Sequence, residues 1–97
     1  MMSITQNIVQ KGDVVIATAG KEKNQIFVVI EKDEKYCYLV DGKRLKIVKP
    51  KKKSLKHVQR ASKTPFPMER LSGQEKDNAE IRKFLKERSD YVKTRCH

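Results

Sequence analysis

The chain has 97 residues, enough for one small domain and an appendage but too few for two domains with separate cores. Its net charge of +11 excludes an acidic protein, and the charge is unevenly placed. Residues 43–60 hold nine Lys and Arg and no acid, whereas residues 1–42 carry a net charge of −1. A local basic block points to a polyanionic partner, more often nucleic acid than an anionic membrane.

The sequence lacks the usual features of membrane and secreted proteins. No stretch approaches the roughly 20 apolar residues of a membrane span, and the N-terminus does not resemble a signal peptide. Cys37 and Cys96 do not suggest a disulfide framework, and Cys96 with His97 supplies two of the about four ligands of a zinc site. We therefore expect a cytoplasmic protein without a metal or cofactor, and Cys37 as a small core residue.

Three short apolar runs begin the domain, at residues 13–19, 25–31 and 36–40. Each is rich in β-branched or aromatic residues, and turn-forming residues separate them, as is typical of strands. The run at 25–31 is almost continuously apolar, which is expected of a well-covered central strand.

A hairpin turn is predicted at Asp41-Gly42, since both central residues of a type I′ turn need positive φ. Residues 44–48 then alternate, so we expect a fourth strand with Leu45 and Ile47 on one face.

Beyond that strand, Pro50 limits further pairing. Residues 50–53 are expected to form an exposed, mobile bend, and residues 54–58 a last short strand. Four or five short strands within about 50 residues indicate a mainly β fold, either a small barrel or a sandwich.

After residue 60 the pattern changes. Residues 61–76 begin with two prolines among small polar residues and predict a linker. The spacing of Ile81, Phe84 and Leu85 predicts a helix over about 77–90, whose narrow apolar stripe either docks on the β domain or makes a dimer contact. Two pairs with capping-box spacing compete for its start: Ser72 with Glu75, and Asp77 with Glu80.

The loop at residues 19–25 contains Gly20 and Asn24, two residue types that tolerate positive φ. A tight loop of this kind exposes backbone N–H groups, and Lys21 and Lys23 add positive charge beside them. It is either a phosphate-contact loop or an ordinary turn with solvated lysines.

The stretch "GDVVIATAGKEKNQIFVVIEKDEKYCYLVDGK" resembles a KOW motif, in which a loop that contains Gly and Lys joins two apolar strands. Residues 12–58 are similar to bacterial KOW-domain RNA-binding proteins related to a large-subunit ribosomal protein of archaea and eukaryotes. The resemblance implies an SH3-like β-barrel that binds RNA, with ribosomal RNA as the expected target. Asn24 stands where the family usually has a second glycine, and the terminal helix matches more loosely.

We therefore expect a KOW/SH3-like RNA-binding barrel of four to five strands in residues 1–60, a linker in 61–76, and a C-terminal helix and tail in 77–97. Lysine dominates the basic block, which favours contact with the RNA backbone over reading of base sequence. The predicted RNA-binding residues are Lys21, Lys23, Asn24, Lys43, Arg44, Lys46, Lys49, Lys51, Lys52, Lys53, Lys56, His57 and Arg60.

Other interpretations stay open. Tyr36 and Tyr38 share a strand face and either stack on unpaired bases or pack on the barrel. The module could bind protein instead of RNA, or bind DNA without sequence preference. No nucleophile–base pair, carboxylate pair or metal cluster stands out, so we expect no enzyme activity and no small-molecule substrate. We expect a monomer that acts in ribosome structure, assembly or translation.

Overall fold

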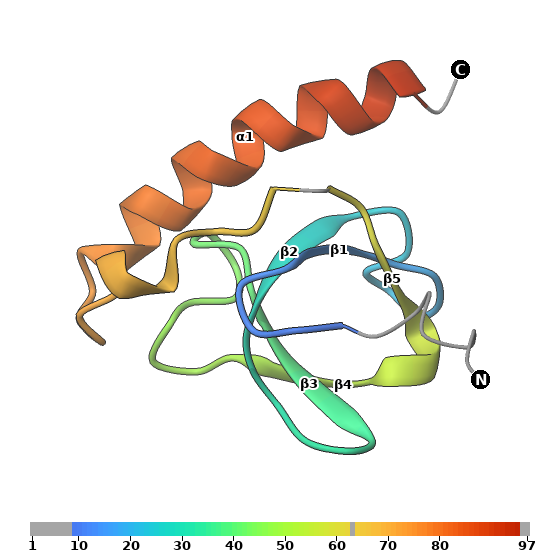
Figure 1. Cartoon of the computed structure of the whole chain (residues 1–97), viewed down its shortest axis with the longest axis horizontal. Coiled ribbons are helices and arrows are strands. Elements are labelled where there is room, and N and C mark those ends of the chain that lie inside the picture. Colours follow the sequence, from blue (N-terminus) through green and yellow to red (C-terminus); the bar gives the residue numbers. More distant parts are fainter. Residues whose placement is uncertain (1–8, 63, 96–97) are drawn as a thin grey trace.

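A computed structural model of the chain describes residues 9–62 and 64–95, with side chains described up to residue 88. It contains one antiparallel sheet of five strands and one long C-terminal helix (Figure 1). The strands are β1 (Val14–Ala17), β2 (Ile26–Lys32), β3 (Tyr36–Val40), β4 (Lys51–Ser54) and β5 (Val58–Arg60). The helices are the short 3-10 turns η2 (Leu55–His57) and η3 (Met68–Arg70), and α1 (Asp77–Arg95). Within these residues, no helix has the length and apolar character needed to cross a membrane.

The sheet is curled. Its strand order is β4-β3-β2-β1-β5, so the two edge strands are consecutive in the chain and only the three residues of η2 separate them. Three residues of 3-10 helix advance the chain by about 6 Å. The outer strands of a flat five-stranded sheet would lie about 19 Å apart. The short connection therefore requires the sheet to bend enough to bring the joined ends of β4 and β5 near each other.

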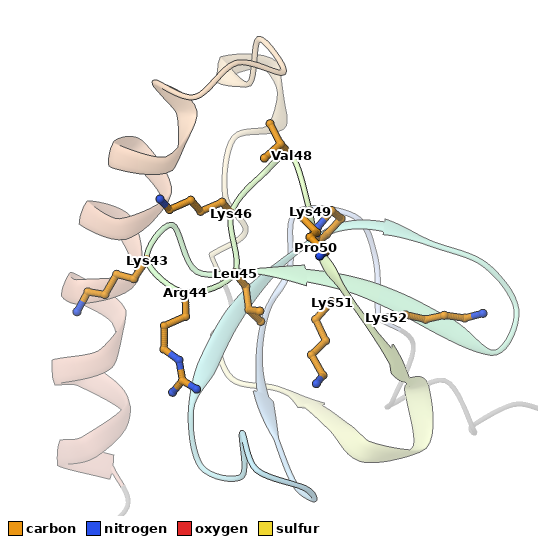
Figure 2. A pocket seen from close by; sticks show the side chains of 9 residues that line it. All are labelled: Lys43, Arg44, Leu45, Lys46, Val48, Lys49, Pro50, Lys51 and Lys52. Atoms are coloured by element: carbon orange, nitrogen blue, oxygen red, sulfur yellow. The ribbon is translucent and has the colours of Figure 1, made fainter.

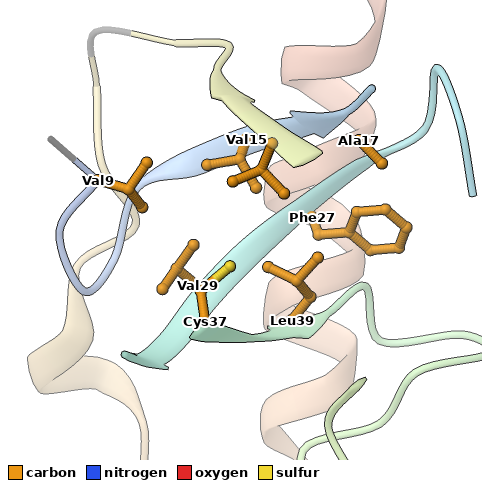
Figure 3. Close-up of a cluster of buried hydrophobic side chains, with 8 residues drawn as sticks. Val9, Val15, Ala17, Phe27, Val29, Cys37 and Leu39 are labelled. Atoms are coloured by element: carbon orange, nitrogen blue, oxygen red, sulfur yellow. The ribbon is translucent and has the colours of Figure 1, made fainter. Parts of the chain in front are cut away.

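Apolar side chains cover both faces of the three central strands, because successive residues of a strand point to opposite sides. The inner face carries one buried cluster (Figure 3). Its members are Val9, Val15, Ala17, Phe27, Val29, Cys37, Leu39 and Val58. The alternate residues Val14, Val28 and Val40 belong to a second cluster on the outer face. The expectation that residues 25–31 form a well-covered central strand is confirmed.

The outer face is covered by α1 and by the segment that precedes it. Ile81 and Leu85 are buried against the sheet, as is Phe66 from residues 61–76. The rings of Phe66 and Phe84 meet edge to face, with centroids 5.2 Å apart. The predicted docking of the apolar stripe of the helix on the β domain is therefore confirmed.

The helix begins at Asp77, as one of the two predicted starts had it, and ends at Arg95, beyond the predicted end at residue 90. Neither Gly nor Pro follows Gly73 in the sequence, so nothing breaks the helix near residue 90. Within the described residues, neither predicted capping box forms; instead, the backbone N–H and the hydroxyl of Ser72 both donate to the carboxylate of Asp77.

The carboxylate of Asp77 organises the turn before α1. It is buried, and it also accepts hydrogen bonds from the backbone N–H groups of Gly73 and Gln74. Burial acts to raise the pKa of this carboxyl group, but the hydrogen bonds from Gly73, Ser72 and Gln74 outweigh it and hold the pKa below its usual range.

The predicted strand at residues 44–48 is wrong. Residues 41–50 form an irregular loop, which we call the basic loop. Leu45 packs against the inner cluster and Ile47 against the outer one, so the two side chains do not share a face. The alternation of apolar residues here reflects a loop that lies across the end of the sheet and reaches both of its faces.

The prediction of a type I′ turn at Asp41-Gly42 is also wrong. Of its two central residues, only Gly42 has a positive φ, 79°. Asp41 instead accepts the backbone N–H groups of Lys43, Arg44 and Leu45 with one carboxylate oxygen, so its side chain builds the turn.

The predicted mobile bend at residues 50–53 is wrong as well, because Lys51–Ser54 form β4, paired with β3 from Leu39↔Lys51 to Tyr36↔Ser54. Lysine is rare in central strands, but β4 is an edge strand, where lysine is well tolerated. The last predicted strand, at 54–58, is instead mostly η2, and β5 begins at Val58.

We predict that Asp77→Asn lowers the free energy of unfolding by about 1–3 kcal/mol at pH 7, because charged hydrogen bonds are replaced by weaker ones. The folded-state pKa of Asp77 is depressed, so its contribution is present above the unfolded-state pKa of about 3.9 and is lost as the pH falls through the folded value. Denaturant titrations of both proteins at several pH values should show the difference shrinking in acid. A difference independent of pH would contradict this role.

Candidate nucleic-acid interface

An open groove of about 780 Å³ runs along the basic loop and the start of β4 (Figure 2). We call it the basic groove. Six of its nine lining residues are Lys or Arg, and none is acidic. The lining residues are Lys43, Arg44, Leu45, Lys46, Val48, Lys49, Pro50, Lys51 and Lys52.

The charged side chains of the groove point in several directions. Lys43 and Lys46 extend on the side of α1, whereas Lys52 extends toward the β2–β3 hairpin (Figure 2). Arg44 and Lys51 lie between these two directions. Such a fan of positive charge fits an extended anion with several charged groups better than one small anion.

The first turns of α1 hold the basic loop in place. The side-chain oxygen of Asn78 accepts the backbone N–H of Ile47 at 2.8 Å. The guanidinium of Arg82 donates to the carbonyl oxygen of Gly42 at 2.7 Å. Helix and loop are more than thirty residues apart in sequence, so local sequence patterns gave no signal for these two contacts.

Gly42 is where the loop comes closest to the helix. A β-carbon at this position would collide with the carbonyl oxygen of Asn78 and press on the backbone and side chain of Arg82. The positive φ of Gly42 is a second reason for glycine here. Both constraints bring the turn against α1 and thereby set the position of the charged residues that follow it.

Lys53 makes structural contacts, and little of its side chain is accessible to a ligand. Its ammonium donates to the carbonyl oxygen of Ala19 at 2.9 Å and to Glu22 at 3.1 Å, and 11% of its side chain is exposed. Lys51 also contacts Glu22, at 3.2 Å, but 42% of its side chain is exposed. The hydrogen bond from Lys53 is the main reason that the pKa of Glu22 lies below its usual range.

The loop at residues 19–25 has the predicted backbone: φ is positive at both Gly20 and Asn24. Its N–H groups are less available than predicted, because those of Lys23, Asn24 and Gln25 donate to carbonyl oxygens within this part of the chain. Lys21 and Lys23 are exposed, yet Glu22 between them places a carboxylate in the loop.

The remaining predicted residues lie elsewhere. Lys56 and His57 are exposed on η2, and Arg60 is exposed at the end of β5, and none of the three lines the basic groove. The structure thus brings six of the predicted cations together in the groove and distributes the others.

The described residues contain no metal-type cluster and no reactive thiol. Among residues 9–62 and 64–88, no three His, Cys, Asp or Glu side chains lie together as a metal site would need. Cys37 is fully buried, and burial raises the pKa of its thiol to about 11, so the reactive thiolate is scarce at neutral pH. Cys96 and His97 lie outside the described residues.

Comparison with known proteins adds no assignment: no protein-family model matches this chain, and no curated protein sequence matches it.

We predict that Gly42→Ala destabilises the protein by about 1–3 kcal/mol more than Gly73→Ala, on the scale of an overpacked core. The two glycines have nearly the same positive φ, 79° and 81°, so the backbone strain of the added β-carbon is shared. They differ in surroundings, because nothing lies within 4 Å of a β-carbon at Gly73. Equal losses in chemical denaturation would mean that the loop does not press on α1.

We predict that Lys53→Met costs about 1–3 kcal/mol of folding free energy, because it removes a charged hydrogen bond that is largely shielded from water. The neighbouring Lys52→Met serves as the control. It removes an exposed ammonium whose contact with the ring of Tyr36 is worth about 1 kcal/mol or less. Thermal and denaturant unfolding would measure both, and equal stability of the two variants would refute the structural role of Lys53.

Proposed function

We propose that this chain is a non-catalytic RNA-binding protein of the KOW type, which holds the phosphate backbone of structured RNA in the basic groove. Ribosomal RNA is the proposed target, and the role is in ribosome structure, assembly or translation. The observation that carries the proposal is the lining of the groove, with six cationic side chains and no acidic one.

The fold supports the family part of the proposal. A KOW domain is a small SH3-like barrel, and this chain has a curled five-stranded antiparallel sheet whose edge strands are linked by one 3-10 turn. The loop between β1 and β2 also has positive φ at Gly20 and Asn24, as the glycine-containing loop of the motif requires.

Recognition through the backbone follows from the kind of cation present. Five of the six charged lining residues are lysines, which act as point charges on flexible stems, and Arg44 is the exception. Contacts of this kind position RNA and carry little base information. Arg44, with its planar fork of donors, is the proposed site of the most geometrically specific phosphate or base contact.

A protein-binding role is the second candidate, and Val48 favours it. This side chain lies in the lining of the groove and is 65% exposed, which is unusual for a large apolar residue in this small protein. The stripe of α1 offers no such surface, because Ile81 and Leu85 are already buried. Binding that persists at about 0.5 M salt would favour a protein partner, since phosphate contacts weaken steeply by then.

We predict that the affinity for structured RNA falls with salt, with a slope of about −4 in log K against log salt if about five phosphates are neutralised. The double variant Lys46→Glu with Lys49→Glu should weaken binding at least tenfold at low salt and flatten this slope. Fluorescence anisotropy with a labelled RNA stem-loop measures both quantities.

The matched control is Lys76→Glu with Lys83→Glu. It changes the net charge equally, and both residues are exposed but lie outside the groove lining. Equal losses in the two double variants would show that net charge, and not the groove, determines binding. Crosslinking in cells followed by sequencing of the attached RNA tests the target: reads concentrated at one ribosomal RNA region support it, and essentially no attached RNA refutes it.

A further inference from the structure

Tyr36 presents an exposed aromatic ring next to the basic groove. Among the described residues it is the one aromatic side chain left exposed, at 38%. Phe27 and Phe66 are buried in the two clusters, and Tyr38, which shares the outer face of β3 with Tyr36, is only partly exposed. The ring of Tyr36 is therefore accessible to a ligand from solvent.

The ring is carried on a rigid backbone. The N–H of Tyr36 donates to the carboxylate of Asp33 at 2.8 Å, and its carbonyl oxygen accepts the N–H of Asp33. On the other side, Tyr36 pairs with Ser54 of β4. The backbone that carries the ring is therefore held in place before any ligand arrives, which lowers the entropy cost of binding.

Lys52 joins the ring to the groove. Its ammonium lies 4.3 Å from the centroid of the Tyr36 ring, and the same residue lines the basic groove. An exposed cation–π contact is weak, so the flexible side chain can turn from the ring to a phosphate with little loss. Along β4, the distance from Ser54 opposite Tyr36 to Lys51 in the groove is about 10 Å, from the rise of three strand residues.

The charge around Tyr36 differs from the charge of the groove. Asp33 and Glu34 are exposed in the hairpin turn beside Tyr36, and the hydrogen bonds from Lys35 and Tyr36 hold the pKa of Asp33 below its usual range. Lys32 and Lys35 flank these two acids, so the hairpin turn has no net charge and attracts phosphate less than the groove does, whereas an uncharged base needs no such attraction. The groove, which has no acid in its lining, accepts the phosphates.

From these observations, and resting on the proposed RNA-binding function, we infer that Tyr36 is a stacking site for one unpaired base of an RNA whose backbone lies in the basic groove. The site reads no particular base, because every base has a flat aromatic face. It selects RNA with an unpaired loop or bulge over a continuous duplex, whose bases are stacked on one another and cannot reach the ring.

The test compares two RNA probes of equal length and charge, a stem-loop with an unpaired loop and a fully paired duplex. Tyr36→Val should weaken binding of the stem-loop about tenfold, in line with the loss of one stacked base, and leave duplex binding unchanged. Tyr36→Phe keeps the aromatic face and should bind both probes as the wild type does. Anisotropy at one low salt concentration gives the affinities, and melting curves check that the variants are folded.

A second measurement uses the unaltered protein, so it does not depend on the folding of a variant. A stem-loop with 5-bromouridine in its loop is crosslinked by ultraviolet light, and mass spectrometry locates the modified residue, expected to be Tyr36. Crosslinks only elsewhere, an equal loss on both probes with Tyr36→Val, or no loss on the stem-loop would each overturn the stacking site while leaving RNA binding intact. Failure of the wild type to bind either probe would overturn the proposed function and this inference together.

Discussion

The contact between the turn at Gly42 and the first turns of α1 connects the core of this protein to its charged surface. Two hydrogen bonds, from Arg82 to Gly42 and from Ile47 to Asn78, join helix and loop at a place where a single added methyl group would not fit. The same helix buries Ile81 and Leu85 against the outer face of the sheet. Docking of the helix on the sheet and placement of the basic loop are therefore coupled, because the same turns of α1 contact both.

A lysine of β4 either makes a structural contact or remains a surface charge, and the face of the strand on which it lies decides which. Lys53 points along the inner side of the edge strand, where Glu22 and the carbonyl oxygen of Ala19 surround its ammonium. Lys52, its neighbour, points to the other face, where its exposed ammonium lies over the ring of Tyr36. The alternation of side chains along β4 thus turns adjacent lysines into a structural contact and a surface charge. Lys53 therefore adds little to the charge that the basic block offers to a partner.

The two ends of the surface around β3 and β4 differ in charge. At one end lies the basic groove, and at the other the hairpin with Asp33 and Glu34, with the exposed ring of Tyr36 between them. In the proposed complex, phosphates lie at the positive end and an unpaired base lies over the ring. On this proposal, a groove in which five of the six cations are lysines would favour one RNA shape without reading its sequence.

The sequence by itself determined the strands at 25–31 and 36–40, the start of the helix at Asp77 and the positive φ at Gly20 and Asn24. These features depend on local patterns, namely apolar runs, helical spacing and residues that tolerate a left-handed backbone. The sequence also located the basic block, residues 43–60, which supplies the cations of the groove. Only the tertiary structure decided that residues 44–48 form a loop and Lys51–Ser54 a strand, because α1 holds the first and β3 pairs the second. The same long-range contacts separated Lys53 from the lysines that face solvent, since no local pattern records a partner more than thirty residues away.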